Sequence, residues 1–279
     1  MIDIFTTPEG LTLSYERRGS GPLLLCHPGG PGCSAAEFRD FAGLDDTFDL
    51  VFLSPRGSAG SDAADDYSLA AYASDLEALR EHLGAEQFDL LGFSHGGMVA
   101  MAYAATFEQR VRRLVLAGTL AVWSDEAQAA MERGIEARRG ESWFADAQQA
   151  IEEEQAGEFS SVKELIANTQ RQAPLYFHRW EGNERIGHEL FADFARSEPL
   201  HQFNTAEFPT LDLRPELRKI AAPTLVLAGD GDMIAGPVCG GAIVRELTDG
   251  RLVRIPDTGH FLSVEQAAAF RAALTDFLV

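Results

Sequence analysis

The segment that most constrains how this chain can fold is Gly92-Phe93-Ser94-His95-Gly96-Gly97. Residues 88–91 before it form a short apolar run, which is typical of a buried parallel strand. Residues 98–107 after it are rich in Ala and Met, which favour a helix. Glycines two positions before and after Ser94 allow a tight turn without a clashing Cβ atom. The segment therefore predicts a serine hydroxyl lifted out of a sheet, with the free N–H groups of a new helix directed at it.

Strand-like and helix-like runs alternate on both sides of this turn. Apolar runs predict strands over residues 11–16, 22–26, 48–53, 113–118, 223–228 and 251–255. The segments between and after them predict helices over residues 67–83, 237–248 and 263–278. This alternation indicates an α/β fold, with a mainly parallel sheet that helices cover on both faces.

The alternation stops after about residue 121 and resumes at about residue 213. Residues 122–212 have helical patterns and many acidic and aromatic side chains. A helical block inserted in an α/β pattern predicts a cap over the carboxyl ends of the strands, where open sheets bind ligands. We therefore expect a core of residues 1–121 and 213–279 and a helical cap of residues 122–212. The alternative is a separate helical domain with no part in the site.

Charge and composition exclude several classes of partner. The net charge of −20 disfavours binding to nucleic acid or to anionic membranes. No apolar stretch approaches the roughly 20 residues that span a bilayer, and residues 1–5 lack the features of a secretory signal. The three cysteines have no C-x-x-C spacing and indicate neither a disulfide framework nor a zinc site. We expect a cytoplasmic protein.

A nucleophilic serine needs a general base and an acid that orients the base. After Ser94, the strand predicted over residues 223–228 leads into a glycine turn with two candidate acids, Asp230 and Asp232. The strand predicted over residues 251–255 is followed by a loop that carries His260. The order Ser, acid, His is that of α/β-hydrolases.

The sequence resembles the α/β-hydrolase family over essentially its whole length. The family's acid usually follows its strand in a G-x-x-D pattern, which implies Asp232 as the catalytic acid and Asp230 as a turn residue. Its histidine sits in a Gly-His loop after the last strand, which implies His260 as the base.

Acyl transfer also needs an oxyanion hole, in which two N–H groups lie about 3 Å from the developing negative charge. We expect one donor to be the N–H of His95, the residue after the nucleophile. The other should come from the loop His27-Pro28-Gly29-Gly30-Pro31-Gly32, whose glycines let the backbone approach a substrate. This loop resembles the H-G-G-P-G loop of the proline iminopeptidase branch, with an extra Pro28. The match implies Gly30 as the second donor, with Gly29 as the fallback.

Two further segments resemble the same branch. Arg56-Gly57-Ser58-Ala59-Gly60-Ser61 is similar to its R-G-x-G-x-S loop, and Arg179-Trp180-Glu181-Gly182 is similar to its W-E-G element. The second match implies that Glu181, next to Trp180, binds the free amino group of the substrate; the other interpretation is an ordinary exposed residue. A second cap glutamate of the branch has no counterpart here, the nearest segment being His201-Gln202-Phe203-Asn204.

Together these features predict a serine hydrolase that resembles proline iminopeptidases. It would release an N-terminal residue, such as proline, from small peptides, amides or esters through an acyl-enzyme. The alternatives are a carboxylesterase or lactonase on the same fold and, from another class, a non-catalytic ligand receptor. The expected partner is a small-molecule or short-peptide substrate rather than nucleic acid or a membrane. No metal or organic cofactor is implied, and the sequence does not indicate an oligomeric state.

Overall fold

The computed structural model describes residues 2–156, 159 and 161–279, and its centre is an eight-stranded sheet. The strands are β1 (Ile2–Thr6), β2 (Thr12–Gly19), β3 (Leu23–His27), β4 (Asp49–Ser54), β5 (Phe88–Phe93), β6 (Val111–Ala117), β7 (Thr224–Gly229) and β8 (Gly250–Ile255). Their order across the sheet is β1-β2-β4-β3-β5-β6-β7-β8. β1 pairs with β2, and β2 with β4, in antiparallel fashion, and every other pair is parallel. The predicted mainly parallel sheet is confirmed.

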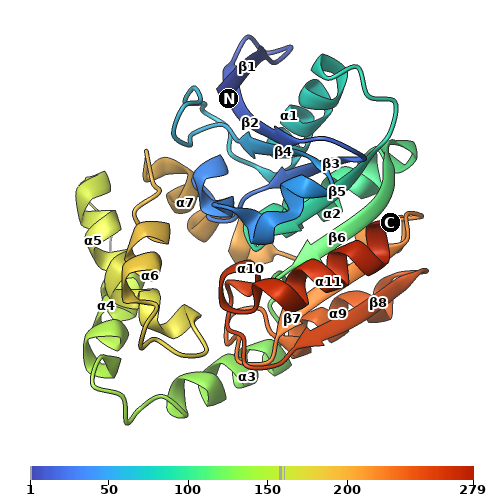
Figure 1. Cartoon of the computed structure of the whole chain (residues 1–279). Helices are drawn as coiled ribbons and strands as arrows, with labels where there is room; N and C mark the ends of the chain where they lie inside the picture. The colour runs from blue at the N-terminus through green and yellow to red at the C-terminus, as the bar shows by residue number, and fades with distance from the viewer. Residues whose placement is uncertain (1, 157–158, 160) are drawn as a thin grey trace.

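Helices cover both faces of the sheet, because buried strands alternate apolar side chains between two cores. In β3, Leu25 belongs to one core, whereas Leu24 and Cys26 belong to the other. The first core is closed by α1 (Leu69–His82), α2 (His95–Thr106) and α9 (Pro237–Glu246). The second is closed by the 3₁₀ helices η1 (Ala35–Phe38) and η2 (Phe41–Asp46) and by α11 (Ala267–Leu278), which Figure 1 shows in front of the sheet.

The segment between β6 and β7 is helical, and much of it stands apart from the sheet, as α4, α5 and α6 do at the left of Figure 1. Its elements are α3 (Asp125–Glu136), α4 (Phe144–Ala156), α5 (Val162–Gln172), η4 (Ala173–Tyr176), α6 (Glu184–Leu190), α7 (Glu198–Gln202), the π-helix η5 (Phe203–Glu207), η6 (Phe208–Thr210) and α8 (Arg214–Leu217). Val122 and Asp212 form an isolated antiparallel bridge, and the N–H of Leu213 donates to the carbonyl of Ala121 at 2.8 Å. The chain therefore leaves the sheet and returns to it at adjacent points.

The predicted elements differ from the observed ones in two instructive places. Strand β1 was not expected, because only one of its five residues is buried and it lies at the edge of the sheet. The helix expected over residues 263–278 is divided into α10 (Leu262–Glu265) and α11 by Gln266, whose φ and ψ of −134° and 57° are not helical. In the described part of the chain, no helix is long and apolar enough to cross a membrane.

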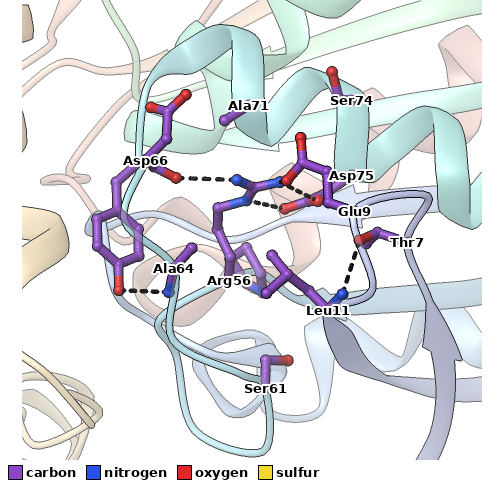
Figure 2. Close-up of polar contacts among 12 residues, drawn as sticks. Thr7, Glu9, Leu11, Arg56, Ser61, Ala64, Asp66, Ala71, Ser74 and Asp75 are labelled. Carbon is purple, nitrogen blue, oxygen red and sulfur yellow. Dashed lines mark hydrogen bonds and ion pairs between the residues drawn. The ribbon is translucent and has the colours of Figure 1, made fainter.

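The loop after β4 is fixed by a buried ion pair (Figure 2). Nε and Nη2 of Arg56 each donate to a carboxylate oxygen of Asp75 at 2.7 Å. The guanidinium also donates to the carbonyl of Asp66 at 3.0 Å and to Glu9 at 3.1 Å. Arg56 and Asp75 are almost completely buried, so this bidentate pair ties the loop to α1. Arg56, the first residue of segment 56–61, therefore has a structural role.

Candidate active site

Ser94 lies at a sharp corner between β5 and α2, with φ 52° and ψ −119°. A positive φ is uncommon for a residue with a side chain, so the surrounding packing must hold it. A Cβ atom on Gly92 would lie 2.3 Å from the carbonyl oxygen of Gly96, and one on Gly96 would lie 2.3 Å from that of Pro28. The close approach of these backbone segments therefore requires both glycines of the motif.

His260 and Asp232 reach the same corner from the ends of two other strands. Nε2 of His260 lies 3.0 Å from Oγ of Ser94, and Nδ1 lies 2.9 Å from Oδ2 of Asp232. His260 and Asp232 are both buried. The loops after β5, β7 and β8 thus bring the three residues into one line of hydrogen bonds.

The charges of the site favour an ionised acid beside a basic imidazole. Burial raises the pKa of Asp232. His260 and the N–H groups of Ile234 and Ala235, which lie 2.9 and 3.1 Å from Oδ1, lower that pKa by more than burial raises it, so it lies below its ordinary value. Burial lowers the pKa of His260, whereas nearby carboxylates raise it, and the net shift is upward. The carboxylates that raise it are Asp232, Glu37 and Glu265. An imidazole in this setting can accept the proton of Ser94.

Asp230, the other candidate acid, lies on the outside of the same turn. Its Oδ1 accepts a hydrogen bond from Nε of Arg254 at 2.7 Å, and the pair is exposed. The structure therefore places Asp232, and not Asp230, beside the imidazole.

The loop after β3 lies against Ser94. A Cβ atom on Gly29 would lie 3.1 Å from Cβ of Ser94. The Gly29 N–H donates to Oε2 of Glu37 at 2.6 Å. Among the described residues, the N–H groups of Gly30 and His95 have no acceptor. Gly30 and His95 therefore stay the proposed oxyanion donors, while the N–H of the fallback Gly29 is already engaged.

Glu37 is a site residue that sequence reasoning missed. Its carboxyl contacts the Gly29 N–H and lines a cavity together with Phe93 and Phe261. Burial raises the pKa of Glu37 to about 7. Only its position, eight residues after Gly29 in the helix that follows the glycine loop, could have signalled it.

The helical segment between β6 and β7 reaches the site through the ring of Tyr176, which lies near His260 beside two rings of the core. The ring of Tyr176 lies 5.5 Å from the imidazole, and the rings of Phe93 and Phe261 lie 5.0 and 5.6 Å from it. These distances are typical of packed aromatic pairs. No motif pointed to Tyr176, which is the last residue of η4.

The W-E-G element of the cap ends in an exposed turn, whereas His260 and Asp232 are buried. Trp180 packs on Phe177 and His188, with ring centroids 5.5 and 5.4 Å apart. Glu181 follows it on an exposed turn, and in the part of the chain that the structure describes its side chain has no hydrogen bond or ion pair. Among the described residues, no hydrogen bond or ion pair joins Glu181 to Ser94, His260 or Asp232, and its role in binding an amino group stays a proposal.

The cysteines of this chain are buried. Cys26, Cys33 and Cys239 are free and buried, and burial raises the pKa of each thiol, that of Cys239 to about 12. A buried thiol of raised pKa is a poor nucleophile. Within residues 2–156, 159 and 161–279, no group of three or more His, Cys, Asp or Glu side chains could hold a metal ion.

Comparisons with known proteins agree with this architecture. A family model described as the alpha/beta hydrolase fold matches residues 22–267. The chain is 24% identical over 268 residues to proline iminopeptidase PfmaB of Pestalotiopsis fici, with 94% of each chain covered. It is also 24% identical over 281 residues to 3-oxoadipate enol-lactonase 2 of Acinetobacter baylyi, with 96% of this chain and 93% of the relative covered. Among solved structures, a hydrolase from Pseudomonas aeruginosa PA01 matches with a TM-score of 0.77 and 26% identity, over 99% and 98% of the two chains.

Proposed function

The chain belongs to the α/β-hydrolase fold family and is an enzyme of the hydrolase type, and from this premise we propose that it is a serine hydrolase with Ser94, His260 and Asp232 as its triad. The observation that carries the proposal is the continuous line of hydrogen bonds from Oγ of Ser94 through the imidazole to Oδ2 of Asp232. This is the geometry that activates a serine for acyl transfer.

In the proposed reaction, Oγ of Ser94 attacks the substrate carbonyl while Nε2 of His260 takes its proton. The N–H groups of His95 and Gly30 stabilise the oxyanion. His260 then gives the proton to the leaving group, which leaves an acyl-enzyme that water hydrolyses by the same route. Asp232 holds the Nδ1–H tautomer and stabilises the imidazolium.

For the substrate, we propose a small N-terminal amino acid derivative, such as a peptide, amide or ester of proline. The similarity to proline iminopeptidase PfmaB and the Gly29-Gly30-Pro31-Gly32 loop support this choice. A carboxylesterase or lactonase is the second candidate. The exposed position of Glu181 favours it, because such an enzyme needs no amino-group site. The similarity to an enol-lactonase supports it as well.

Two assays test the proposal. A fluorophosphonate should label the wild-type protein at Ser94 and leave Ser94→Ala unlabelled. A protein without that adduct would instead fit a non-catalytic receptor. Parallel turnover of a prolyl p-nitroanilide and of an acyl p-nitrophenyl ester then separates the two enzyme candidates. A wild-type preference for simple acyl esters would exclude the iminopeptidase-like activity.

A further inference from the structure

Residues 176–179 of the cap lie against the loop that carries His260. The backbone N–H of His260 donates to the carbonyl of Tyr176 at 2.7 Å. The ring of Tyr176 also packs 5.5 Å from the imidazole. The proposed base is therefore hydrogen-bonded through its own backbone to the cap.

Glu265, in α10, ties the same cap segment to the residue before the base. Its Oε1 accepts from the N–H of Gly259 at 2.8 Å, and its Oε2 accepts from the N–H of His178 at 2.7 Å. The backbone N–H of Arg179 also interacts with this carboxylate. One side chain thus holds the His260 loop and the cap together.

Arg138, which follows α3, connects the same cap segment to the loop that carries Asp232. Its Nη2 donates to the carbonyl of Gly231 at 2.9 Å and to that of Phe177 at 3.3 Å. Gly231 directly precedes Asp232. The segment of residues 176–179 is therefore bonded to both loops, through Glu265 to one and through Arg138 to the other.

The two loops carry glycines where the cap segment touches them. A Cβ atom on Gly259 would lie 2.3 Å from the carbonyl oxygen of Tyr176 and 2.6 Å from the N of His178. A Cβ atom on Gly231 would lie 2.5 Å from Nδ1 of His178. Neither glycine has a positive φ, so the close approach itself requires them. The junction between the cap segment and the loops therefore has no room for a side chain at Gly259.

We propose that Glu265 is a positioning residue for His260, which it serves by holding the Gly259–His260 loop on the cap and by placing a negative charge near the imidazole. The inference rests on the proposed function, because it concerns the same base. The charged or titratable groups around Glu265 are Asp232 and His260 in the two loops, Arg138 after α3, and His178 and Arg179 in the cap, with Asp257 3.6 Å from His178.

The charge of Glu265 gives the proposal a measurable signature. Glu265 is one of the carboxylates that raise the pKa of His260. Removing its charge should lower that pKa, since a nearby negative charge favours the imidazolium. Burial raises the pKa of Glu265 itself to about 7, although three backbone N–H groups lower it. The acid limb of the wild-type profile therefore includes Glu265 as well as His260.

The test is Glu265→Gln, which keeps the shape of the side chain but removes its charge and one acceptor. We expect the pKa of His260, followed by imidazole NMR, to fall by about half a pH unit or more. We expect kcat/KM at the optimum to fall roughly tenfold, because the base is less well placed. The acid limb should move to lower pH. Glu246→Gln is the control, since Glu246, the last residue of α9, pairs with Arg218 and should change neither quantity.

Glu265→Asp separates the two parts of the proposal, because it keeps the charge and shortens the reach. Here kcat/KM should fall while the pKa of His260 stays raised. The proposal would be overturned if Glu265→Gln left both the His260 titration and kcat/KM unchanged. If the Gln variant does not fold, an unchanged kcat/KM in Glu265→Asp would overturn it instead. Failure of both variants to fold would assign Glu265 to folding alone, which also overturns it. If wild-type Ser94 takes no fluorophosphonate label, the proposed function fails, while the His260 titration still tests this inference.

Discussion

The residues that sequence motifs marked in the strand-end loops lie together in the structure, whereas the one marked in the inserted helical segment has no hydrogen bond or ion pair with them in the described part of the chain. Ser94, Asp232 and His260 follow three different strands and meet within hydrogen-bonding distance. Glu181, singled out by an equally local motif, lies exposed with no hydrogen bond or ion pair among the described residues. A parallel sheet fixes where its strand ends meet, so the sheet also determines the position of a motif that directly follows a strand. A motif on a helical insertion has no such frame.

The inserted helices nevertheless contact the site, and they do so mainly through backbone groups. The carbonyl of Tyr176 accepts from the N–H of His260, and the N–H of His178 donates to Glu265. Because any residue can supply a carbonyl, and any residue except proline an N–H, contacts of this kind leave no trace in a motif. The contrast is therefore between side chains placed by the sheet and main chain placed by the cap.

The strongest test of the sheet side is Ser94→Ala. Removing the nucleophile should lower kcat/KM by a factor on the order of 10⁶, because nucleophile and base act as a unit. Circular dichroism should show an unchanged fold, since only a small, half-buried hydroxyl is lost. Retention of more than about a tenth of wild-type kcat/KM, in a reaction where acid–base catalysis supplies at least 10²-fold, would remove Ser94 from the mechanism.

The second test compares the two acids of one turn. Asp232→Asn should lower kcat by about 10⁴-fold, because the wrong imidazole tautomer would face Ser94. Asp230→Asn should stay close to wild type, since it loses only an exposed ion pair with Arg254. Steady-state kinetics on both variants provides the measurement. Equal effects of the two substitutions would contradict the proposal that Asp232, and not Asp230, is the triad acid.

A third test concerns stability and compares ion pairs in the two regions. Asp75→Asn leaves the buried guanidinium of Arg56 without its main partner and should cost about 3–5 kcal/mol in urea unfolding. Glu136→Gln removes a pair with Arg139 that is exposed on α3, and no change of the midpoint is expected. Similar midpoints for the two variants would contradict the structural role assigned to the Arg56 loop.

Glu37 supplies a smaller effect on stability, whose size depends on pH. Its folded-state pKa of about 7 lies above the ordinary value of 4.5, so the folded protein holds this proton more tightly than the unfolded chain. The associated stability is present below about pH 4.5 and is lost as the pH rises through 7. Glu37→Gln should therefore raise Tm at pH 8 and leave it nearly unchanged at pH 4. A lower Tm for the variant at pH 8 would show that the carboxylate stabilises the glycine loop.

The smallest expected effect is that of Glu181→Gln. An exposed carboxylate is screened by solvent, so kcat/KM for substrates with a free amino terminus should change by less than about threefold. The same substrates in N-acetylated form provide the comparison. A selective loss on the order of ten- to a hundredfold, the value of one charge-assisted hydrogen bond, would restore the amino-group role implied by the W-E-G match.

Sequence reasoning predicted the elements whose apolar pattern is strong. The buried runs of β3, β5 and β7 could be predicted because each fills a core on both faces. Strand β1 could not, because Ile2 and Ile4 are exposed and its pattern carries little burial signal. The break at Gln266 was equally hidden, since the residues on both sides of it favour a helix.

The residues of the site also differ in how far the sequence predicts their positions. The triad residues lie in glycine-marked turns after strong strands, so their positions could be predicted, while their roles stay a proposal. Glu37 and Glu265 could not be found, because each is an ordinary acid in a short helix and gains its importance from what folds against it. Their partners, the N–H groups of Gly29, Gly259 and His178, are backbone atoms that no residue type encodes.

The bridge between Val122 and Asp212 makes the insertion, in principle, an exchangeable module. Two closely spaced junctions would let a chimera carry the helices of another hydrolase without changing the spacing of β6 and β7. Substrate range could be transplanted in this way, but the graft would also replace Arg138 and the backbone acceptor at residue 176. A successful exchange therefore has to conserve that short stretch of main chain, which is hydrogen-bonded to the loop that carries His260.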